Sequence, residues 1–381
     1  MDSKQTMAEV KTCANPGCDQ PGTKSCASCK ITVYCCVICQ TTDWPSHKEM
    51  CDGHLRKIGK ANLNKARGFS REQNLVQELF YAEIAATKLK QLKDRRLETV
   101  EVIDEALGFK CNALLRMGRH SEAMKCAEEN YTLWAMNQMR NPGSMKAALQ
   151  LIHSCIHNEK FEDAEFYSRE AYFMINDMAD NFIPADERPS FLAEVSSCLA
   201  QSITKKLAEV KDIPLEEKKK AGEEAITLAR KALEIRIQLR GATTGKYANS
   251  QVAYMMGALA DTLDYFNNVD DDEPIRLKEQ AIAIYSQADG SSSINVGSRN
   301  NNLGYAYNNR AERAQAANDL DRELTNLELA LTHYREGLRI YRINNHADRT
   351  SDALNNLAAV EKKIRRVVFA KAAAAAAASR R

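Results

Sequence analysis

The chain has 381 residues and a formal net charge of +2, which is long enough for one large core and a small additional module. The near balance of charge gives no global attraction to nucleic acid or to an anionic membrane. The sequence contains no run of roughly 18 apolar residues, so we expect no membrane span.

The twelve cysteines are unevenly distributed. Eight lie between Cys13 and Cys51, and four are scattered afterwards: Cys111, Cys126, Cys155 and Cys198. The start, MDSKQTMAEV, lacks the apolar core of a secretory signal, so we expect a cytoplasmic or nuclear protein, or both. In such a reducing compartment, clustered cysteines indicate metal binding rather than disulfides. We interpret the scattered four as small buried core residues.

Nine candidate metal ligands lie in the cysteine-rich segment. They read Cys13-x4-Cys18, Cys26-x2-Cys29, then Cys35, Cys36 and Cys39, then His47 and Cys51. Closely spaced cysteine pairs of this kind indicate zinc. Two tetrahedral sites need eight ligands, so one candidate is in excess. Spacing alone leaves the choice open: Cys35 could share a helix face with Cys39, or Cys36-Val-Ile-Cys39 could form a knuckle.

Residues 13–51 resemble a MYND zinc finger. The resemblance rests on C-x4-C, C-x2-C, YC-x3-CQ, W-x2-HK and a last cysteine, and it includes the non-ligand positions Tyr34, Gln40, Asp43, Trp44 and Lys48. It implies that Cys35, and not Cys36, is a ligand, and that two zinc ions are bound in an interleaved manner. One zinc would be held by Cys13, Cys18, Cys35 and Cys39, and the other by Cys26, Cys29, His47 and Cys51.

The two zinc ions are expected to be structural. A segment of this length cannot bury enough apolar surface to fold alone. Zinc binding, on the order of 10–16 kcal/mol in finger peptides, would supply the missing stability. Every ligand position can be filled by the protein, which is typical of a structural metal site rather than a catalytic one.

Gln40 and Trp44 are the candidate peptide-binding residues. Four positions apart, they would share one face of a helix. A tryptophan ring can pack on proline, and an amide can bond to a peptide backbone. In MYND fingers that resemble this one, these positions line a groove for proline-containing motifs, which implies partner proteins carrying such motifs. The alternative is that Trp44 only forms the small core of the finger, and both roles can hold together.

A basic segment follows the finger, and we interpret residues 52–70 as a solvated basic linker. Basic residues occur in it and just beyond it, at Arg56, Lys57, Lys60, Lys65, Arg67 and Arg71. Within residues 1–60, eight Lys or Arg face six Asp or Glu and form no evident stripe. This charge distribution argues against direct binding of nucleic acid.

From about residue 71, Ala, Leu, Glu, Lys and Arg dominate, and alternation typical of strands is nearly absent. The sequence therefore predicts a mostly α fold, with a two-zinc finger followed by helical repeats over residues 71–368. Residues 1–12 would form a flexible N-terminus, and residues 369–381 an Ala-rich basic tail.

The helical body contains weak internal repeats. GRHSEAMKCAEE resembles NEKFEDAEFYSREA and matches Ala123 with Ala164. MMGALADTL, NNNLGYAYNN and ALNNLAAVE read as first helices of pairs, and EEAITLARKALEI, LKEQAIAIY and LTHYREGLRIY as second helices. These strings resemble the tetratricopeptide family, nearer its kinesin-light-chain type, over roughly residues 105–365. The resemblance implies an α-solenoid in which Ala and Gly allow close approach of neighbouring helices.

The concave face of such a solenoid would hold a second partner protein. Amide side chains can bond to both the donors and the acceptors of an extended peptide, so the candidate groove residues are asparagines: Asn301, Asn308 and Asn355, with Asn302 and Asn356 beside them. The alternative for each of them is a local structural role.

We interpret the protein as a non-enzymatic adaptor that binds other proteins. One alternative is a divergent SET and MYND methyltransferase, because Ile152-His-Ser-Cys-Ile-His-Asn158 resembles the NHSC-x-P-N string of those enzymes. Ile152 and His157 depart from that string, and no Gly-rich cofactor segment precedes the finger. The other alternative is a transcription-associated regulator.

Overall fold

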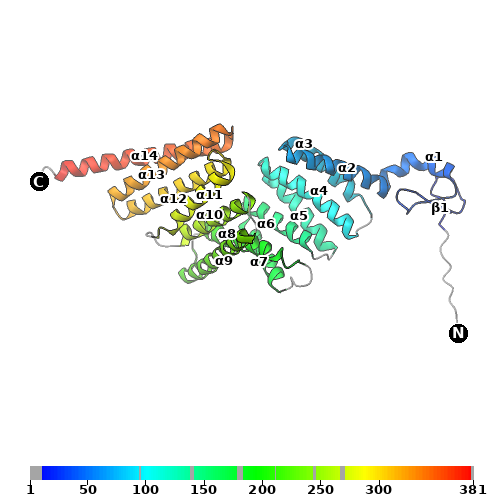
Figure 1. Ribbon diagram of the computed structural model, residues 1–381, viewed down its shortest axis with the longest axis horizontal. Helices are drawn as coiled ribbons and strands as arrows, with labels where there is room; N and C mark the ends of the chain where they lie inside the picture. Colours follow the sequence, from blue (N-terminus) through cyan, green and yellow to red (C-terminus); the bar gives the residue numbers. More distant parts are fainter. Residues whose placement is uncertain are drawn as a thin grey trace. The chain divides into compact units, whose positions relative to one another are not determined.

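The computed structural model describes residues 11–93, 96–137, 141–177, 183–210, 212–242, 246–266 and 271–378. This part of the chain is almost entirely helical, with two short strands near its N-terminal end (Figure 1). The predicted mostly α fold class is therefore confirmed. The finger region contains β1 (Lys24–Ser25), β2 (Val33–Tyr34), α1 (Val37–His47) and the 3-10 turn η1 (Lys48–Met50).

Thirteen further helices follow in the described residues. They are α2 (Asp52–Arg71), α3 (Leu75–Lys90), α4 (Leu97–Arg116), α5 (His120–Met136), α6 (Pro142–His157), α7 (Phe161–Asp177), α8 (Arg188–Glu209), α9 (Leu215–Ala242), α10 (Lys246–Phe266), α11 (Glu273–Asp289), α12 (Ile294–Ala316), α13 (Leu320–Ile343) and α14 (Ala347–Ala378). None of them is long and apolar enough to cross a bilayer over the described residues.

The chain divides into two compact units, residues 1–160 and 161–381. Within each unit, a helix packs mainly on the helices that precede and follow it, and in places on the next but one, as α8 does on α10. Such nearest-neighbour packing of antiparallel helices is the arrangement of an α-solenoid. The predicted repeat strings fall where they should, with first helices in α10, α12 and α14 and second helices in α9, α11 and α13.

Five turns between helices share one hydrogen-bond pattern. After α4, the amide of Arg119 donates to the carbonyl of Leu114 at 2.9 Å, and the amide of Gly118 donates to the carbonyl of Leu115 at 3.1 Å. This is the Schellman motif, which requires one residue with positive φ. The positive-φ residues have φ between 53° and 72° and are Gln73, Gly118, Glu159, Asn318 and Asn345.

Small residues lie where helices approach most closely, as predicted. A Cβ atom added to Gly59 of α2 would lie 2.5 Å from the Leu89 side chain of α3, and one added to Gly304 would lie 2.9 Å from the Tyr334 ring. The matched pair Ala123 and Ala164 is fully buried in α5 and α7.

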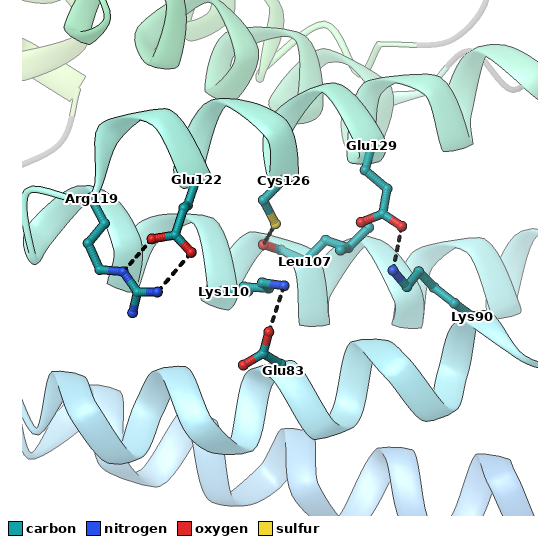
Figure 2. Close-up of polar contacts among 8 residues, drawn as sticks. All are labelled: Glu83, Lys90, Leu107, Lys110, Arg119, Glu122, Cys126 and Glu129. Carbon is teal, nitrogen blue, oxygen red and sulfur yellow. Dashed lines mark hydrogen bonds and ion pairs between the residues drawn. The ribbon is translucent and has the colours of Figure 1, made fainter.

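Polar contacts join α3, α4 and α5 (Figure 2). Glu83 of α3 accepts a bond from Lys110 of α4 at 3.1 Å, and Lys90 at the end of α3 donates to Glu129 of α5 at 2.5 Å. These pairs are exposed, so each contributes about 0–1 kcal/mol. Cys126 is buried, like the other three scattered cysteines, and its Sγ lies 3.5 Å from the carbonyl oxygen of Leu107. Their predicted role in the core is confirmed.

The segment at 52–70 differs from the predicted linker, because it forms helix α2. Its buried residues Leu55, Leu63 and Ala66 recur at helical spacing on the side that faces α3. The many basic residues between them obscured this pattern in the sequence. The helical body therefore begins at Asp52 rather than near residue 71. At the other end, α14 continues to Ala378, so the described part of the predicted tail is helical.

Candidate metal centre and binding surfaces

The finger is held together by few backbone contacts. Strand β1 pairs antiparallel with β2, and an isolated bridge joins Thr12 to Pro21. The amide of Cys26 donates to the carbonyl of Thr32 at 2.7 Å, which closes the turn that carries Cys26 and Cys29. Helix α1 then supplies ligands from its first and last turns. The buried side chains of this region are those of three cysteines, Tyr34 and His47, so its core consists largely of candidate ligands.

Two groups of four ligand atoms come together in this region. In each, the atoms lie within 4.8 Å of one another: Cys13, Cys18, Cys35 and Cys39 in the first, and Cys26, Cys29, His47 and Cys51 in the second. Each group joins residues that are far apart in the sequence, so the groups are interleaved along the chain. The two predicted ligand sets are confirmed as clusters.

The spacing of the ligand atoms fits tetrahedral zinc. With Zn–S bonds of about 2.3 Å and Zn–N bonds of about 2.0 Å, two sulfurs should lie about 3.8 Å apart, and a sulfur and a nitrogen about 3.5 Å apart. The Sγ atom of Cys35 lies 3.6 Å from that of Cys18 and 3.4 Å from that of Cys39. In the second cluster, Cys29 Sγ lies 3.5 Å from His47 Nε2. Both clusters thus suit a zinc ion closed by protein ligands.

A residue outside the second cluster contacts one of its ligands. Thr32 Oγ1 lies 3.4 Å from His47 Nδ1, so the ring nitrogen that faces away from Cys29 has a polar neighbour. Such a contact fixes the orientation of a ligand imidazole. Cys51 belongs to this cluster and is also the N-cap residue of α2. A zinc ion bound there would be joined directly to the first turn of the helical body.

Cys36 stands outside both clusters. It is the N-cap residue of α1, with extended backbone, and its Sγ atom accepts a bond from the amide of Cys39 at 3.5 Å. Cys35 therefore lies before the helix and not in its first turn. Cys35 and Cys39 do not share a helix face, which was one of the two arrangements that their spacing allowed. The excess cysteine has a capping position, where side-chain acceptors stabilise the start of a helix.

Tyr34 and Asp43 explain two non-ligand positions of the finger pattern. Tyr34 is fully buried, and its hydroxyl donates to Asp43 Oδ2 at 2.7 Å. Burial, together with this bond to a carboxylate, raises the pKa of Tyr34 above its usual range. The bond links β2 to the middle of α1, and it orients the helix that carries Cys39 and His47.

Gln40 and Trp44 both lie on α1 and are partly exposed. The Trp44 ring meets the rings of His47 and His54 edge-on, each with centroids 5.7 Å apart, so it packs on the finger and on the first turn of α2. Val37 lies at i−3 from Gln40 on the same helical face and is 62% exposed. The sequence alone does not indicate this residue, because its exposure depends on where α1 begins.

A groove of about 690 Å³ lies on the second unit. Three alternate helices line it, α8, α10 and α12, with residues Thr204, Lys205, Ala208, Asp261, Asp264, Tyr265, Asn302, Tyr305, Asn309, Glu312, Arg313 and Ala316. Buried Lys278 of α11 donates to Asp261 at 2.5 Å and forms an ion pair with Asp264 at 2.9 Å, which holds both carboxylates in place. Tyr305 is 60% exposed over this groove.

The main predicted groove asparagines, Asn301, Asn308 and Asn355, lie on α12 and α14 and are not among the residues that line this groove. Asn301 accepts a bond from Asn356 at 3.3 Å, and Asn308 accepts one from Lys363 at 2.9 Å. Asn355 is exposed. Asn302 and Asn309 line the groove itself, and Asn309 was not among the predicted residues. Asn301 and Asn308 thus join two first helices of neighbouring pairs.

The segment from Ile152 to Asn158 covers the last turns of α6 and its C-cap. Ile152 and Cys155 are buried among the helices of the first unit. The string that resembles a methyltransferase motif therefore occupies a helix of the repeat region.

Comparison with known proteins identifies the finger. Residues 13–51 match the family model of the MYND finger. A segment of 74 residues is 34% identical to Tudor domain-containing protein 1 of Oryzias latipes. That match covers 19% of this chain and only 6% of the relative, so the chain spans a small part of that protein's length.

Solved structures resemble the helical body. One is a protein assigned as a kinesin light chain of Podospora anserina, with nearly identical TPR-like repeats; the match has 17% identity and a TM-score of 0.43, and covers 61% of this chain and 97% of that one. Another is a Rap protein complexed with competence and sporulation factor, with 9% identity and a TM-score of 0.48, covering 85% of this chain and 82% of that one.

Proposed function

We propose that this protein is a non-enzymatic adaptor whose finger binds proline-containing peptide segments through Gln40 and Trp44. The observation that carries the proposal is the shared face of α1, on which an amide and a large ring are both partly exposed. Proline side chains would pack on the ring, and the amide would bond to the peptide backbone. Val37 would extend the apolar surface on the same face.

The zinc clusters would make this surface rigid. Cys39 and His47 hold α1 at both ends, and Tyr34 holds its middle through Asp43. A preorganised surface loses little conformational entropy on binding, which favours short peptide ligands. Zinc would supply the fold of the finger here and no chemistry.

The groove on α8, α10 and α12 would bind a second partner protein. Its lining alternates carboxylates, amides and the exposed ring of Tyr305, which suits an extended peptide with mixed side chains. Two binding modules on one chain raise the effective concentration for a ligand that engages both. We propose that this coupling is the purpose of joining a finger to helical repeats.

The test is selection of random 12-residue peptides on the zinc-loaded full chain, with the best peptide then measured by fluorescence anisotropy. We expect enriched proline, and affinity losses of about tenfold or more for Trp44→Ala and Gln40→Ala. Thr41→Ala is the matched control, because this residue is exposed on α1 and its hydroxyl bonds only to its own helix at Val37. Unchanged affinity in a Trp44→Ala variant that still binds two zinc ions would contradict the proposal.

A further inference from the structure

Helix α2 carries an unusual excess of positive charge. Between Gly53 and Arg71 it has six Lys or Arg and no Asp or Glu. Two of the six are engaged, because Arg67 pairs with Glu105 at 2.5 Å and Arg56 donates to Thr99 at 2.8 Å. The other four are exposed and have no carboxylate partner among the described residues: Lys57, Lys60, Lys65 and Arg71.

Three of these four cations share one face of the helix. Lys57, Lys60 and Arg71 stand at i, i+3 and i+14, and the rise of a helix places the first and last about 21 Å apart. Ala61 and Gly68 lie on the same face, and a Cβ atom added to Gly68 would meet nothing within 4 Å. The face is therefore open, and no bulky side chain covers the charges.

An aromatic cluster lies beside Lys65, the fourth exposed cation, on the flank of α2 toward α3. Lys65 Nζ is 4.8 Å from the centre of the Tyr81 ring, and Phe69 stacks on Tyr81 with centroids 5.4 Å apart. Phe80 of α3 meets Tyr81 edge-on at 5.1 Å and is 54% exposed. An exposed ring on α3 and exposed cations on the adjoining helix α2 form a combination that can bind bases and phosphates together.

We propose that α2 and the aromatic cluster form a binding site for single-stranded nucleic acid. The cations of α2 contact phosphates along one strand, and Phe80 stacks on a base. The inference goes beyond the adaptor function, since it uses neither Gln40 and Trp44 nor the groove of the second unit. The charge count over residues 1–60 missed this site, because that window ends inside α2 and includes the acids of the finger.

The test is fluorescence anisotropy of fluorescein-labelled oligo(U) and oligo(dT), each of about 15 nucleotides, with the zinc-loaded full chain. Affinity should fall with salt, with a log–log slope of about −2 to −3 for three or four phosphate contacts. Changing Lys57, Lys60, Lys65 and Arg71 together to Gln should weaken binding at least about tenfold and flatten this slope. Phe80→Ala should weaken binding at least about fivefold with an unchanged slope.

A matched control removes the same number of charges elsewhere. Lys219, Lys220, Lys362 and Arg365 are exposed on α9 and α14, and their joint change to Gln should leave binding intact. Absence of saturable binding at about 50 mM salt would overturn the proposal. Displacement of the oligonucleotide by polyglutamate at equal charge would also overturn it, in favour of an acidic protein partner. So would equal affinity for a duplex with no effect of Phe80→Ala.

Discussion

The vicinal pair Cys35 and Cys36 places two similar side chains in different roles. Cys35 Sγ lies within a cluster, whereas Cys36 Sγ caps α1 through the amide of Cys39. We expect Cys36→Ser to retain two zinc ions, because serine is a better N-cap than cysteine. Cys35→Ser should lower the zinc content toward one ion per chain, because it removes a thiolate ligand.

Zinc content per chain, measured by mass spectrometry of the metal, distinguishes the two variants. Cys126→Ser serves as a control for the loss of a thiol outside the finger. Loss of one zinc ion in Cys36→Ser, with both retained in Cys35→Ser, would reverse the assignment of ligand and cap.

Asp104 is a second residue whose surroundings give a testable consequence. Burial raises the pKa of this carboxyl, and the bonds that it accepts from Trp134 and Asn130 offset that only in part. Asp104 Oδ1 lies 3.1 Å from Trp134 Nε1 and 2.7 Å from Asn130 Nδ2, and both donor residues are buried. The negative charge of Asp104 therefore destabilises the fold, whereas its oxygen atom is needed as the acceptor for Trp134 and Asn130.

We expect Asp104→Asn to be neutral or stabilising at pH 7, because the amide oxygen can accept the same bonds without a charge. Asp104→Ala should lower the free energy of unfolding by about 1–3 kcal/mol, because it leaves two buried donors unpaired. A native pKa above the unfolded value means that the native state binds more protons, so wild-type stability falls as pH rises through this range. The advantage of Asp104→Asn over the wild type should thus grow above about pH 4 and then level off.

Urea denaturation of the three proteins from acid to neutral pH checks both expectations. The difference between wild type and Asp104→Asn removes contributions from other groups that titrate in the same range. A difference that does not change with pH would show that the carboxyl titrates alike in both states.

The residues that could best be predicted from the sequence are those whose type and spacing are set by metal binding. The zinc ligands could be predicted because metal geometry demands particular residue types at short intervals. Val37 could not be predicted, since its exposure depends on where α1 begins. Asn309 could not be predicted either, since its position depends on which face of α12 points into the groove. Those features arise from tertiary packing, which local sequence does not encode.

At the scale of elements, the helices were predictable and several of their ends were not. Two of the five Schellman turns lack a local sequence signal, because Gln73 and Glu159 adopt positive φ without being Gly or Asn. A left-handed conformation at an ordinary residue costs roughly 1–2 kcal/mol, so packing of the flanking helices must enforce it. Packing against α3 likewise stabilises a helix, α2, in the segment that was predicted to be a linker.

Close approach of helices predicts opposite effects of one substitution at two glycines. Gly304 of α12 faces the Tyr334 ring at 2.9 Å from an added Cβ, whereas Gly108 of α4 faces open space. Gly304→Ala should destabilise its unit by about 1–3 kcal/mol through overpacking. Gly108→Ala should stabilise its unit by about 0.5–1 kcal/mol, because alanine favours the helix. Thermal unfolding followed by calorimetry measures both, and shifts of the same sign would contradict the packing argument.

At the scale of the whole molecule, stability is local, because a helix in a repeat array contacts mainly the helices nearest to it in the chain. The finger meets this array at the first turn of α2. Cys51 is both a candidate ligand and the N-cap of α2, and a Cβ atom added to Gly53 would lie 2.2 Å from the carbonyl oxygen of Ser28, in the turn that carries Cys26 and Cys29. Zinc binding to the native state should therefore stabilise the finger and the start of α2 together.

We expect zinc removal by a chelator to act on the first unit alone. Hydrogen exchange followed by mass spectrometry should show lost protection over residues 13–51 and reduced protection in the first turns of α2, while α8 to α14 keep theirs. Addition of zinc should restore protection, which controls for irreversible damage. Gly53→Ala should uncouple α2 from the finger, because the turn that carries Cys26 and Cys29 can no longer approach α2. Full protection of α2 without zinc would show that α3 alone holds this helix, and exchange that spreads to α14 would show that the units unfold as one.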